Sequence, residues 1–231
     1  LHNQRNIGLA ASLNLGIDRA RGEYIARMDC DDISLPKRLE RQVEYLDSNP
    51  DICVCGTWAE VIDDQGTKIR DRPMPTGRAL QLRPWLTSPI IHASAMIRRR
   101  QLGNTRYDPS LACAQDFDLW FKLGEKCKLD NIPEVLLKYR VHSDNISQQR
   151  KDEQLKNSYA IFVNHTGIAS VSYDEYLSLV YCSFKLTPIQ HFLLTLKLSK
   201  LAKKRYIHLL RDSLIYMKLW FRNADRNHKH L

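Results

Sequence analysis

The sequence lacks the features that identify several large classes of protein. It has no run of about 18 or more apolar residues, so we predict no transmembrane helix. No secretory signal peptide is recognisable. The sequence also has no internal repeat, no low-complexity segment and no known nucleic-acid-binding motif. With a nearly neutral first half, this pattern argues against a nucleic-acid partner.

Cysteine is present, but not in patterns that indicate metal binding. None of the six cysteines forms a Cys-x-x-Cys pair, and Cys53-x-Cys55 has no partner ligands nearby. Scattered cysteines in a chain of this size are typical of a reducing compartment with free, mostly buried thiols. We therefore expect neither a zinc site nor a disulfide framework, and we expect a cytoplasmic location.

Positive charge exceeds negative charge, but unevenly along the chain. The 231 residues are enough for one α/β domain with an appendage, and the formal net charge is +9. Residues 1–150 hold 22 Lys and Arg against 20 Asp and Glu, whereas residues 151–231 hold 13 against 6. The basic excess therefore belongs to the C-terminal part. Because the chain begins with Leu1, we expect it to be a piece of a longer or processed protein.

Three carboxylates follow directly after a short, mostly apolar segment. Residues 23–28 predict a buried strand, and Asp29, Asp31 and Asp32 come next. We place them at the carboxyl end of the strand, where α/β proteins bind ligands. Three like charges raise one another's pKa unless a cation offsets them, and a hard divalent ion with phosphate ligands would do so. The alternative is an acidic turn in which Asp32 or Ser34 caps the next helix.

Hydrophobic periodicity and turn residues predict alternating helices and strands in the first 147 residues. We expect helices at about 9–19, 35–48 and 78–86, a central strand within 51–62, a return strand at 68–72, and closing strands at 129–132 and 135–141. In the second helix, Leu39, Val43 and Leu46 recur at helical spacing.

After residue 147 the pattern becomes helical. We expect helices at about 149–164, 173–184, 188–200 and 203–222. The last two combine leucines with lysines. They either lie on an anionic membrane surface or pack as a helical appendage.

Another candidate site lies in residues 114–123. Leu119, Trp120 and Leu123 make an apolar helical face, which puts Asp116 at the N-terminus of that helix. Asp116 is then either an N-cap or a general base. A carboxylate at the edge of an apolar pocket can take a proton from a hydroxyl within hydrogen-bond reach.

Several of these stretches, in the same order, resemble the family 2 glycosyltransferases with a GT-A fold. Residues 20–42 resemble the region of the family's Asp-x-Asp motif. Residues 114–123 resemble its Glu-Asp-x-Asp-Leu-Trp motif, with Gln115 in place of Glu. Three further matches are residues 6–14, similar to Asn-x-Gly-x-Ala-x-x-x-Asn, residues 88–98, where a His precedes a strand, and residues 132–142, similar to the end of the family's domain. The resemblance covers residues 3–147.

The resemblance implies an α/β fold, a GT-A (Rossmann-like) mixed sheet with helices on both faces. Residues 1–147 would form this domain without the family's first β-α-β nucleotide-binding part, and residues 148–231 would form a basic α-helical region. On this reading the piece alone is weakly active or inactive.

The resemblance also implies roles for individual residues. Asp31, with Asp29 and His142, would hold Mn²⁺ or Mg²⁺, and Asp116 would be the general base. The substrate-binding positions would be Asn6, Gly8, Asn14, Asp32, His92, Arg98, Asp118 and Trp120. A lone His is more often structural than functional, so His92 rests on the surrounding match.

The implied reaction is an inverting transfer of a sugar from a nucleotide-sugar, a UDP-sugar in our interpretation, to a hydroxyl of a glycan or lipid-linked acceptor. Surface-polysaccharide assembly at the inner face of the membrane would suit the basic C-terminal part, by analogy only. The alternatives are a metal-dependent nucleotidyltransferase, for which the sequence lacks a Gly-rich basic phosphate loop, and a noncatalytic membrane-associated fragment.

Overall fold

The computed structural model describes residues 2–77, 80, 86–142, 145, 149–169 and 171–180. The chain divides into two compact units. The first comprises Leu1–Gln81 and Ser88–Ser158, and the second comprises Leu82–Thr87 and Tyr159–Leu231. The candidate site lies in the first unit.

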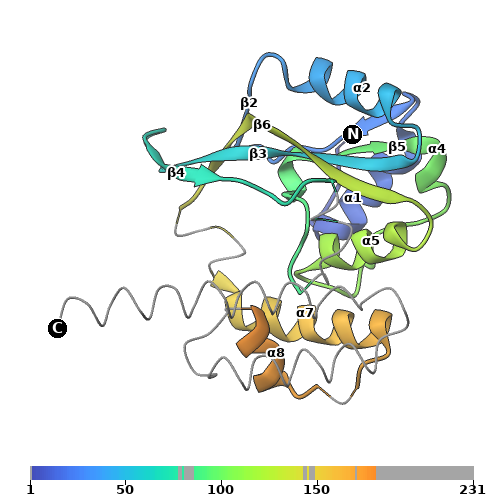
Figure 1. Cartoon of the computed structure of the whole chain (residues 1–231), viewed down its shortest axis with the longest axis vertical. Helices are drawn as coiled ribbons and strands as arrows, with labels where there is room; N and C mark the ends of the chain where they lie inside the picture. The colour runs from blue at the N-terminus through green and yellow to red at the C-terminus, as the bar shows by residue number, and fades with distance from the viewer. Residues whose placement is uncertain are drawn as a thin grey trace, which may run out of the picture. The chain divides into compact units, whose positions relative to one another are not determined.

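A six-stranded mixed sheet forms the centre of the first unit (Figure 1). Its strands are β1 (Tyr24–Ala26), β2 (Ile33–Ser34), β3 (Ile52–Ile62), β4 (Lys68–Arg72), β5 (Met96–Arg98) and β6 (Lys128–Arg140). The order is β1-β5-β3-β6-β2, and β4 pairs with β3 beside this path. β3 and β6 are parallel, and the other pairs are antiparallel. The predicted mixed α/β sheet is confirmed.

β3 is the central strand, as its apolar run predicted. Residues 52–57 are buried, and the strand pairs with β5 along one edge and with β6 along the other. A strand covered on both faces needs such a run, because neither face meets water. The predicted return strand is also confirmed, since β4 pairs with β3.

β6 corrects the prediction of two closing strands, because residues 128–140 form one strand. In its pairing with β3, Thr57 lies opposite Ile132, and the next residue, Trp58, lies opposite Val135. Pro133 and Glu134 are thus left out of the ladder. Proline has no N–H to donate, so a bulge accommodates it without ending the strand.

Helices lie on both faces of this sheet. They are α1 (Leu9–Arg19), α2 (Arg38–Ser48), α4 (Arg99–Leu102) and α5 (Gln115–Gly124), with a 3₁₀ turn η1 (His92–Ser94). α2 packs on β3 and β6, and α5 packs on β6 from the other side (Figure 1). The bounds of α1 agree with the predicted helix.

α2 begins later than predicted, and its buried face is different. Ile33 and Ser34 form β2, which pairs with β6, so neither Asp32 nor Ser34 caps the helix. That alternative reading of the acidic cluster was wrong. Leu46 is buried and Val43 is partly buried, as predicted, but Leu39 is 50% exposed, and Arg38 and Gln42 are buried as well.

Hydrogen bonds explain why two polar residues are buried on α2. The Arg38 guanidinium donates to the carbonyls of Ala93 (2.7 Å) and Arg27 (3.1 Å). The Gln42 amide donates to the carbonyls of Cys55 (3.0 Å) and Ser94 (2.8 Å). Buried polar groups are stable when paired in this way. α2 thereby ties the end of β1 to η1.

The expectation of free thiols was wrong for one pair, because Cys53 and Cys127 form a disulfide. Cys53 is at the start of β3, and Cys127 directly precedes β6. These two strands run side by side from the pair Ile52 and Lys128, which brings the two Cα atoms to 5.8 Å. The other cysteines in the described part of the chain, Cys30, Cys55 and Cys113, are free thiols.

The C-terminal helices are described only in part. α7 (Lys151–Thr166) and α8 (Tyr173–Val180) confirm the predicted helices at 149–164 and, as far as it is described, at 173–184. In the second unit, Tyr159 and Phe162 of α7 pack against Tyr176 of α8. The helices predicted at 188–200 and 203–222, and most of that at 78–86, lie outside the described residues. Within the described part, no helix is long and apolar enough to span a membrane.

The packing around Gly56 on β3 gives a first prediction. A Cβ atom there would overlap Asn131 Oδ1 and lie 2.7 Å from Ile90 Cγ2. We expect Gly56→Ala to lower the free energy of unfolding by about 1–3 kcal/mol, because it overpacks the core. Gly16→Ala, in the middle of α1 with open space around it, is the matched control and should be neutral or stabilising by up to about 1 kcal/mol. Urea unfolding measures both, and equal effects of the two changes would contradict this packing.

Candidate active site

The three aspartates come together after β1, as predicted. The strand itself was predicted wrongly as a buried one over residues 23–28, because β1 spans only Tyr24–Ala26, none of its residues is buried, and Met28 is 41% exposed. Asp29, Asp31 and Asp32 each offer a carboxylate oxygen, and these atoms lie within 4.8 Å of one another. Asp32 is 6% exposed; its Oδ1 accepts a hydrogen bond from the Arg140 backbone N–H (2.8 Å). Its Oδ2 is buried and has no hydrogen-bond partner among the described residues. A cluster of oxygens with one unpartnered buried acceptor fits a hard divalent cation.

Cationic and polar groups surround this cluster. The buried Arg27 guanidinium makes a bidentate pair with the Asp29 carboxylate. His142 Nε2 lies 3.0 Å from Asp31 Oδ2. The Arg140 side chain also donates to the Asp31 carbonyl (2.9 Å). His142, in the segment that follows β6, therefore contacts Asp31. Both residues were predicted as metal ligands.

The electrostatics of Asp32 reflect its burial. The pKa of this carboxyl is raised to about 6. Burial is the largest cause, and the neighbouring Asp29 and Asp31 charges act in the same direction, whereas the Arg140 N–H and Arg27 act against them. At neutral pH the cluster carries a carboxylate that the protein alone stabilises poorly. A bound cation would offset that charge.

Asp116 lies in the first turn of α5, as predicted, but it is not the N-cap. The N-cap is Ala114, whose φ of 62° lies in the left-handed region. The Asp116 Oδ2 instead makes a 3.0 Å hydrogen bond with the Ser88 hydroxyl. Burial raises the pKa of the Asp116 carboxyl, while Ser88, the Phe117 N–H and the Arg27 charge act in the opposite direction.

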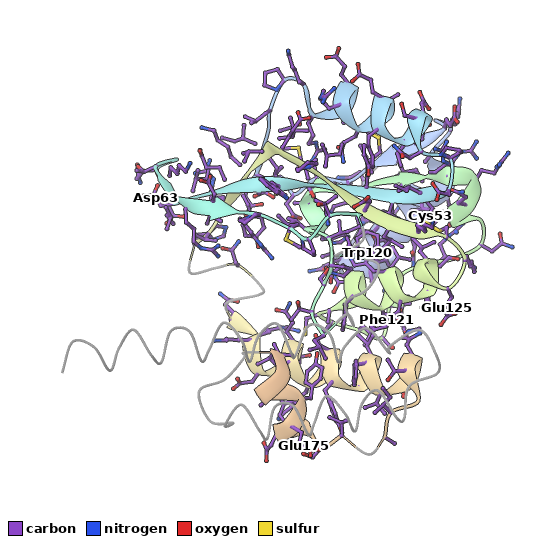
Figure 2. All side chains as sticks on the ribbon, in the orientation of Figure 1. Cys53, Asp63, Trp120, Phe121, Glu125 and Glu175 are labelled. Carbon is purple, nitrogen blue, oxygen red and sulfur yellow. A yellow bond between two sulfur atoms is a disulfide. The ribbon has the colours of Figure 1, made fainter. Side chains whose placement is uncertain are left out.

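Predicted residues His92, Asn14 and Trp120 gather beside Asp116 around Tyr107. His92 Nε2 lies 2.8 Å from the Tyr107 hydroxyl, and the His92 ring packs edge-on against Trp120. Asn14 makes two 2.9 Å hydrogen bonds with the backbone of Tyr107. Burial holds the pKa of His92 well below its usual value, and Arg27 lowers it further, so the imidazole is neutral. Figure 2 labels Trp120, which is fully buried on α5.

Sequence reasoning missed Arg27, which links the two groups. Its charge acts on Asp32 in the acidic cluster and on His92, Tyr107 and Asp116 around the base. An arginine in an otherwise apolar segment that precedes three aspartates was the available signal. Ser88 and Tyr107 were also missed, and no spacing in the sequence points to them.

The structure does not bring the remaining predicted residues to this point. Asp118 is ion-paired with Lys122 (2.6 Å), one turn along α5. Asn6 accepts a hydrogen bond from the Gly8 N–H (2.9 Å) in the exposed loop before α1.

Arg98 lies opposite Tyr24, at the end of β1 away from the aspartates. Its guanidinium stacks on the Tyr24 ring and donates to the Leu46 carbonyl (2.6 Å). It lines a separate pocket of about 440 Å³. The other residues that line this pocket are Arg21, Glu23, Pro50, Arg99 and Arg100.

Known proteins are similar to this chain in sequence and in fold. Residues 1–104 match the family model described as Glycosyl transferase family 2. The Uncharacterized glycosyltransferase MJ1057 of Methanocaldococcus jannaschii is 34% identical over 165 residues, which are 70% of this chain and 57% of that protein. The Amylovoran biosynthesis glycosyltransferase AmsE of Erwinia amylovora is 27% identical over 69% of this chain and 60% of its own length. The chain thus spans little more than half the length of these relatives.

A solved structure supports the fold. The mannosyltransferase PcManGT from Pyrobaculum calidifontis, in complex with GDP-Man and Mn²⁺, superposes with a TM-score of 0.51, covering 95% of this chain and 68% of that one. At 14% identity this likeness shows the fold alone. It confirms the predicted GT-A architecture.

The buried Asp32 gives a prediction for stability as a function of pH. Its folded pKa of about 6 exceeds the usual value of 3.8. The folded state therefore favours the protonated form, and wild-type stability falls as pH rises through about 6. Asp32→Asn removes this penalty and keeps the side-chain oxygen that accepts from Arg140.

The measurement is made in EDTA. We expect the free energy of unfolding of Asp32→Asn to exceed that of wild type by more at about pH 8 than at about pH 4, and this increase should reach up to about 3 kcal/mol. Asp64→Asn, an exposed change elsewhere, is the control. Urea unfolding at both pH values measures the difference. The same difference at both would mean that Asp32 is not protonated preferentially in the folded state.

Proposed function

The chain belongs to glycosyl transferase family 2, and from that premise we propose that its site transfers a sugar from a nucleotide-sugar donor to a hydroxyl of an acceptor, with inversion at the anomeric carbon. The observation that carries the proposal is the juxtaposition of two groups with different chemistry. An acidic cluster after β1 and a single carboxyl on α5 lie within the electrostatic reach of one arginine, Arg27. One group suits a metal-bound diphosphate, and the other suits a general base.

In this proposal Asp31 and Asp29, with His142, hold Mn²⁺ or Mg²⁺. The ion would neutralise the negative charge that develops on the departing nucleoside diphosphate. Asp29 is already paired with Arg27, whereas Asp32 has a buried oxygen without a partner in the described part of the chain. Asp32 is therefore a further candidate ligand. Mn²⁺ with GDP-Man in the structural neighbour is consistent with this choice.

Asp116 serves as the general base. The proton of the acceptor hydroxyl passes to the Asp116 carboxylate while the hydroxyl oxygen forms a bond to the anomeric carbon. The bond from that carbon to the diphosphate breaks, and its electron pair leaves with the diphosphate. Burial raises the pKa of Asp116, which makes its ionised form a stronger base than an exposed aspartate. The ring of His92, neutral in this environment, packs edge-on against Trp120, and Trp120 donates to Ser88, the hydrogen-bond partner of Asp116.

The acceptor and the cellular location are proposed from the name of one relative and from the charge of the C-terminal part. We propose a glycan or lipid-linked acceptor in surface-polysaccharide synthesis, a role consistent with the name of the Erwinia relative. We also propose that residues 1–147 form the transferase domain, and that residues 148–231 form a basic region that suits an anionic membrane surface at the cytoplasmic face. UDP-sugar remains our proposed donor.

Nucleotide titration of matched variants tests the two roles. Calorimetry of UDP and of GDP, each with Mn²⁺ and with EDTA, is made on this chain and on the longer protein to which we expect it to belong, and at least the longer form should show metal-dependent binding of one of them. Asp31→Ala should weaken that binding by about 10–100-fold. Asp116→Asn should leave it within a few-fold of wild type, yet lower the release of nucleoside diphosphate from the donor sugar by about 100-fold or more.

Two results would contradict the proposal. If nucleotide binding is the same in EDTA and in Mn²⁺, the proposed role of the metal is wrong. If the Asp116→Asn variant has wild-type turnover, Asp116 is not the general base.

A further inference from the structure

Ser88 has three hydrogen-bond contacts around a single hydroxyl oxygen. Its Oγ lies 3.0 Å from Asp116 Oδ2, 2.8 Å from the Ile90 carbonyl oxygen and 3.1 Å from Trp120 Nε1. The segment that carries Ser88 is fixed from the sheet, because the Asn131 side chain donates to the Pro89 carbonyl (2.9 Å). Trp120 is fully buried and fixed as well. The hydroxyl is therefore held in one place with several partners.

Counting protons shows that these contacts cannot all have one fixed direction. The indole N–H of Trp120 only donates, so Ser88 accepts from it. Ser88 has one proton of its own and two neighbouring acceptors, the Ile90 carbonyl and the Asp116 carboxylate. A hydroxyl proton makes one strong hydrogen bond at a time, and its rotation about the C–O bond selects the acceptor.

The protonation state of Asp116 decides between the two arrangements. When Asp116 is ionised, it can only accept, and Ser88 donates to it. When Asp116 is protonated, it can donate to Ser88, whose two lone pairs then accept from Asp116 and Trp120. The Ser88 proton is then free to turn to Ile90. In both states Ser88 accepts from Trp120 and is hydrogen-bonded to Asp116, and no heavy atom has to move; only in the protonated state does its own proton reach the Ile90 carbonyl.

We propose that Ser88 is a positioning residue for Asp116, and that its hydroxyl reverses the direction of their hydrogen bond as the carboxyl gains and loses a proton. The inference rests on the proposed function in one respect only, that the proton comes from the acceptor hydroxyl. A base held in the same orientation before and after proton transfer needs little reorganisation during the reaction, which lowers the barrier.

Several charged and titratable groups also face Asp116, and the test must separate them from Ser88. Arg27, at the end of β1, favours the ionised carboxylate. The Phe117 N–H in α5 does the same. The Asp116 charge also acts on Tyr107, whose pKa burial raises, and the neutral His92 lies 2.8 Å from the Tyr107 hydroxyl. None of these groups is changed by substitution of Ser88.

The test is direct titration of Asp116 in variants of the whole chain, by NMR of ¹³C-labelled aspartate carboxyls. Ser88→Ala removes the hydrogen bond to the charged form, which is the stronger of the two, so the pKa of Asp116 should rise by about one unit. Ser88→Thr keeps the hydroxyl and should titrate like wild type. Ser88→Cys, with a weak donor, should fall between them. Ser110→Ala, a serine on the exposed loop before α5, is the control.

Turnover provides a second readout. In Ser88→Ala, the acidic limb of the pH–rate profile should move upward with the carboxyl pKa, kcat should fall about 10-fold or more, and the KM for the donor should stay unchanged. Ser88→Thr should show the wild-type pH–rate profile and the wild-type kcat. If Ser88→Thr does not fold, the intermediate values of Ser88→Cys serve the same purpose.

The outcomes separate this inference from the proposed function. A pKa shift in Ser88→Ala without sugar transfer by this chain or by the longer protein to which we expect it to belong would leave the Ser88–Asp116 coupling intact and would overturn the transferase proposal. An active wild type whose Asp116 titration and pH–rate profile are unchanged in Ser88→Ala would overturn the role of Ser88 alone.

Discussion

Repulsion among three carboxylates at the end of one short strand is the constraint on which the site depends. Asp29, Asp31 and Asp32 cannot lie within 4.8 Å of one another without neighbours that offset their charge. Arg27 pairs with the first, His142 contacts the second, and the Arg140 N–H holds the third. Two of these neighbours come from the end of β6. The short pairing of β2 with β6 brings that segment beside the aspartates. A two-residue strand therefore has a large effect on the site.

Buried polar residues on α2 hold the other half of the site in place. Arg38 bonds the carbonyls of Arg27 and Ala93, and so joins the end of β1 to η1, which carries His92. Gln42 bonds the carbonyls of Cys55 and Ser94 on β3 and η1. Replacing either residue by an apolar one would leave buried carbonyls unpaired, which is more costly than the loss of an exposed hydrogen bond. The helix thus positions the backbone that carries the candidate residues, without contacting a substrate.

The sequence predicts the elements whose signal is local. The apolar run of β3, the periodicity of α1 and the step from apolar to acidic residues after β1 each depend on neighbours in the chain, and each agrees with the structure. The sequence misleads where tertiary contacts override periodicity. Leu39 was expected on the apolar face of its helix but is 50% exposed, whereas Arg38 and Gln42 are buried because their side chains donate to backbone carbonyls. The disulfide also needs the parallel pairing of β3 and β6, which no cysteine spacing reveals. Asp116 is visible in a motif, but its partner Ser88 lies 28 residues away in sequence, and the matching stretch that begins with Ser88 singled out only His92 and Arg98.

The most direct test of this account is whether a divalent ion binds among the aspartates that follow β1. Titration of the ¹⁵N-labelled chain with Mn²⁺, followed by NMR, reports the location, because a paramagnetic ion broadens the signals of nearby amides. We expect the amides of residues 29–32 and 140–142 to broaden first. The amides of Gly22 and Arg99, at the opposite end of β1, should stay sharp. Broadening centred elsewhere, or unchanged signals at residues 29–32, would contradict the account.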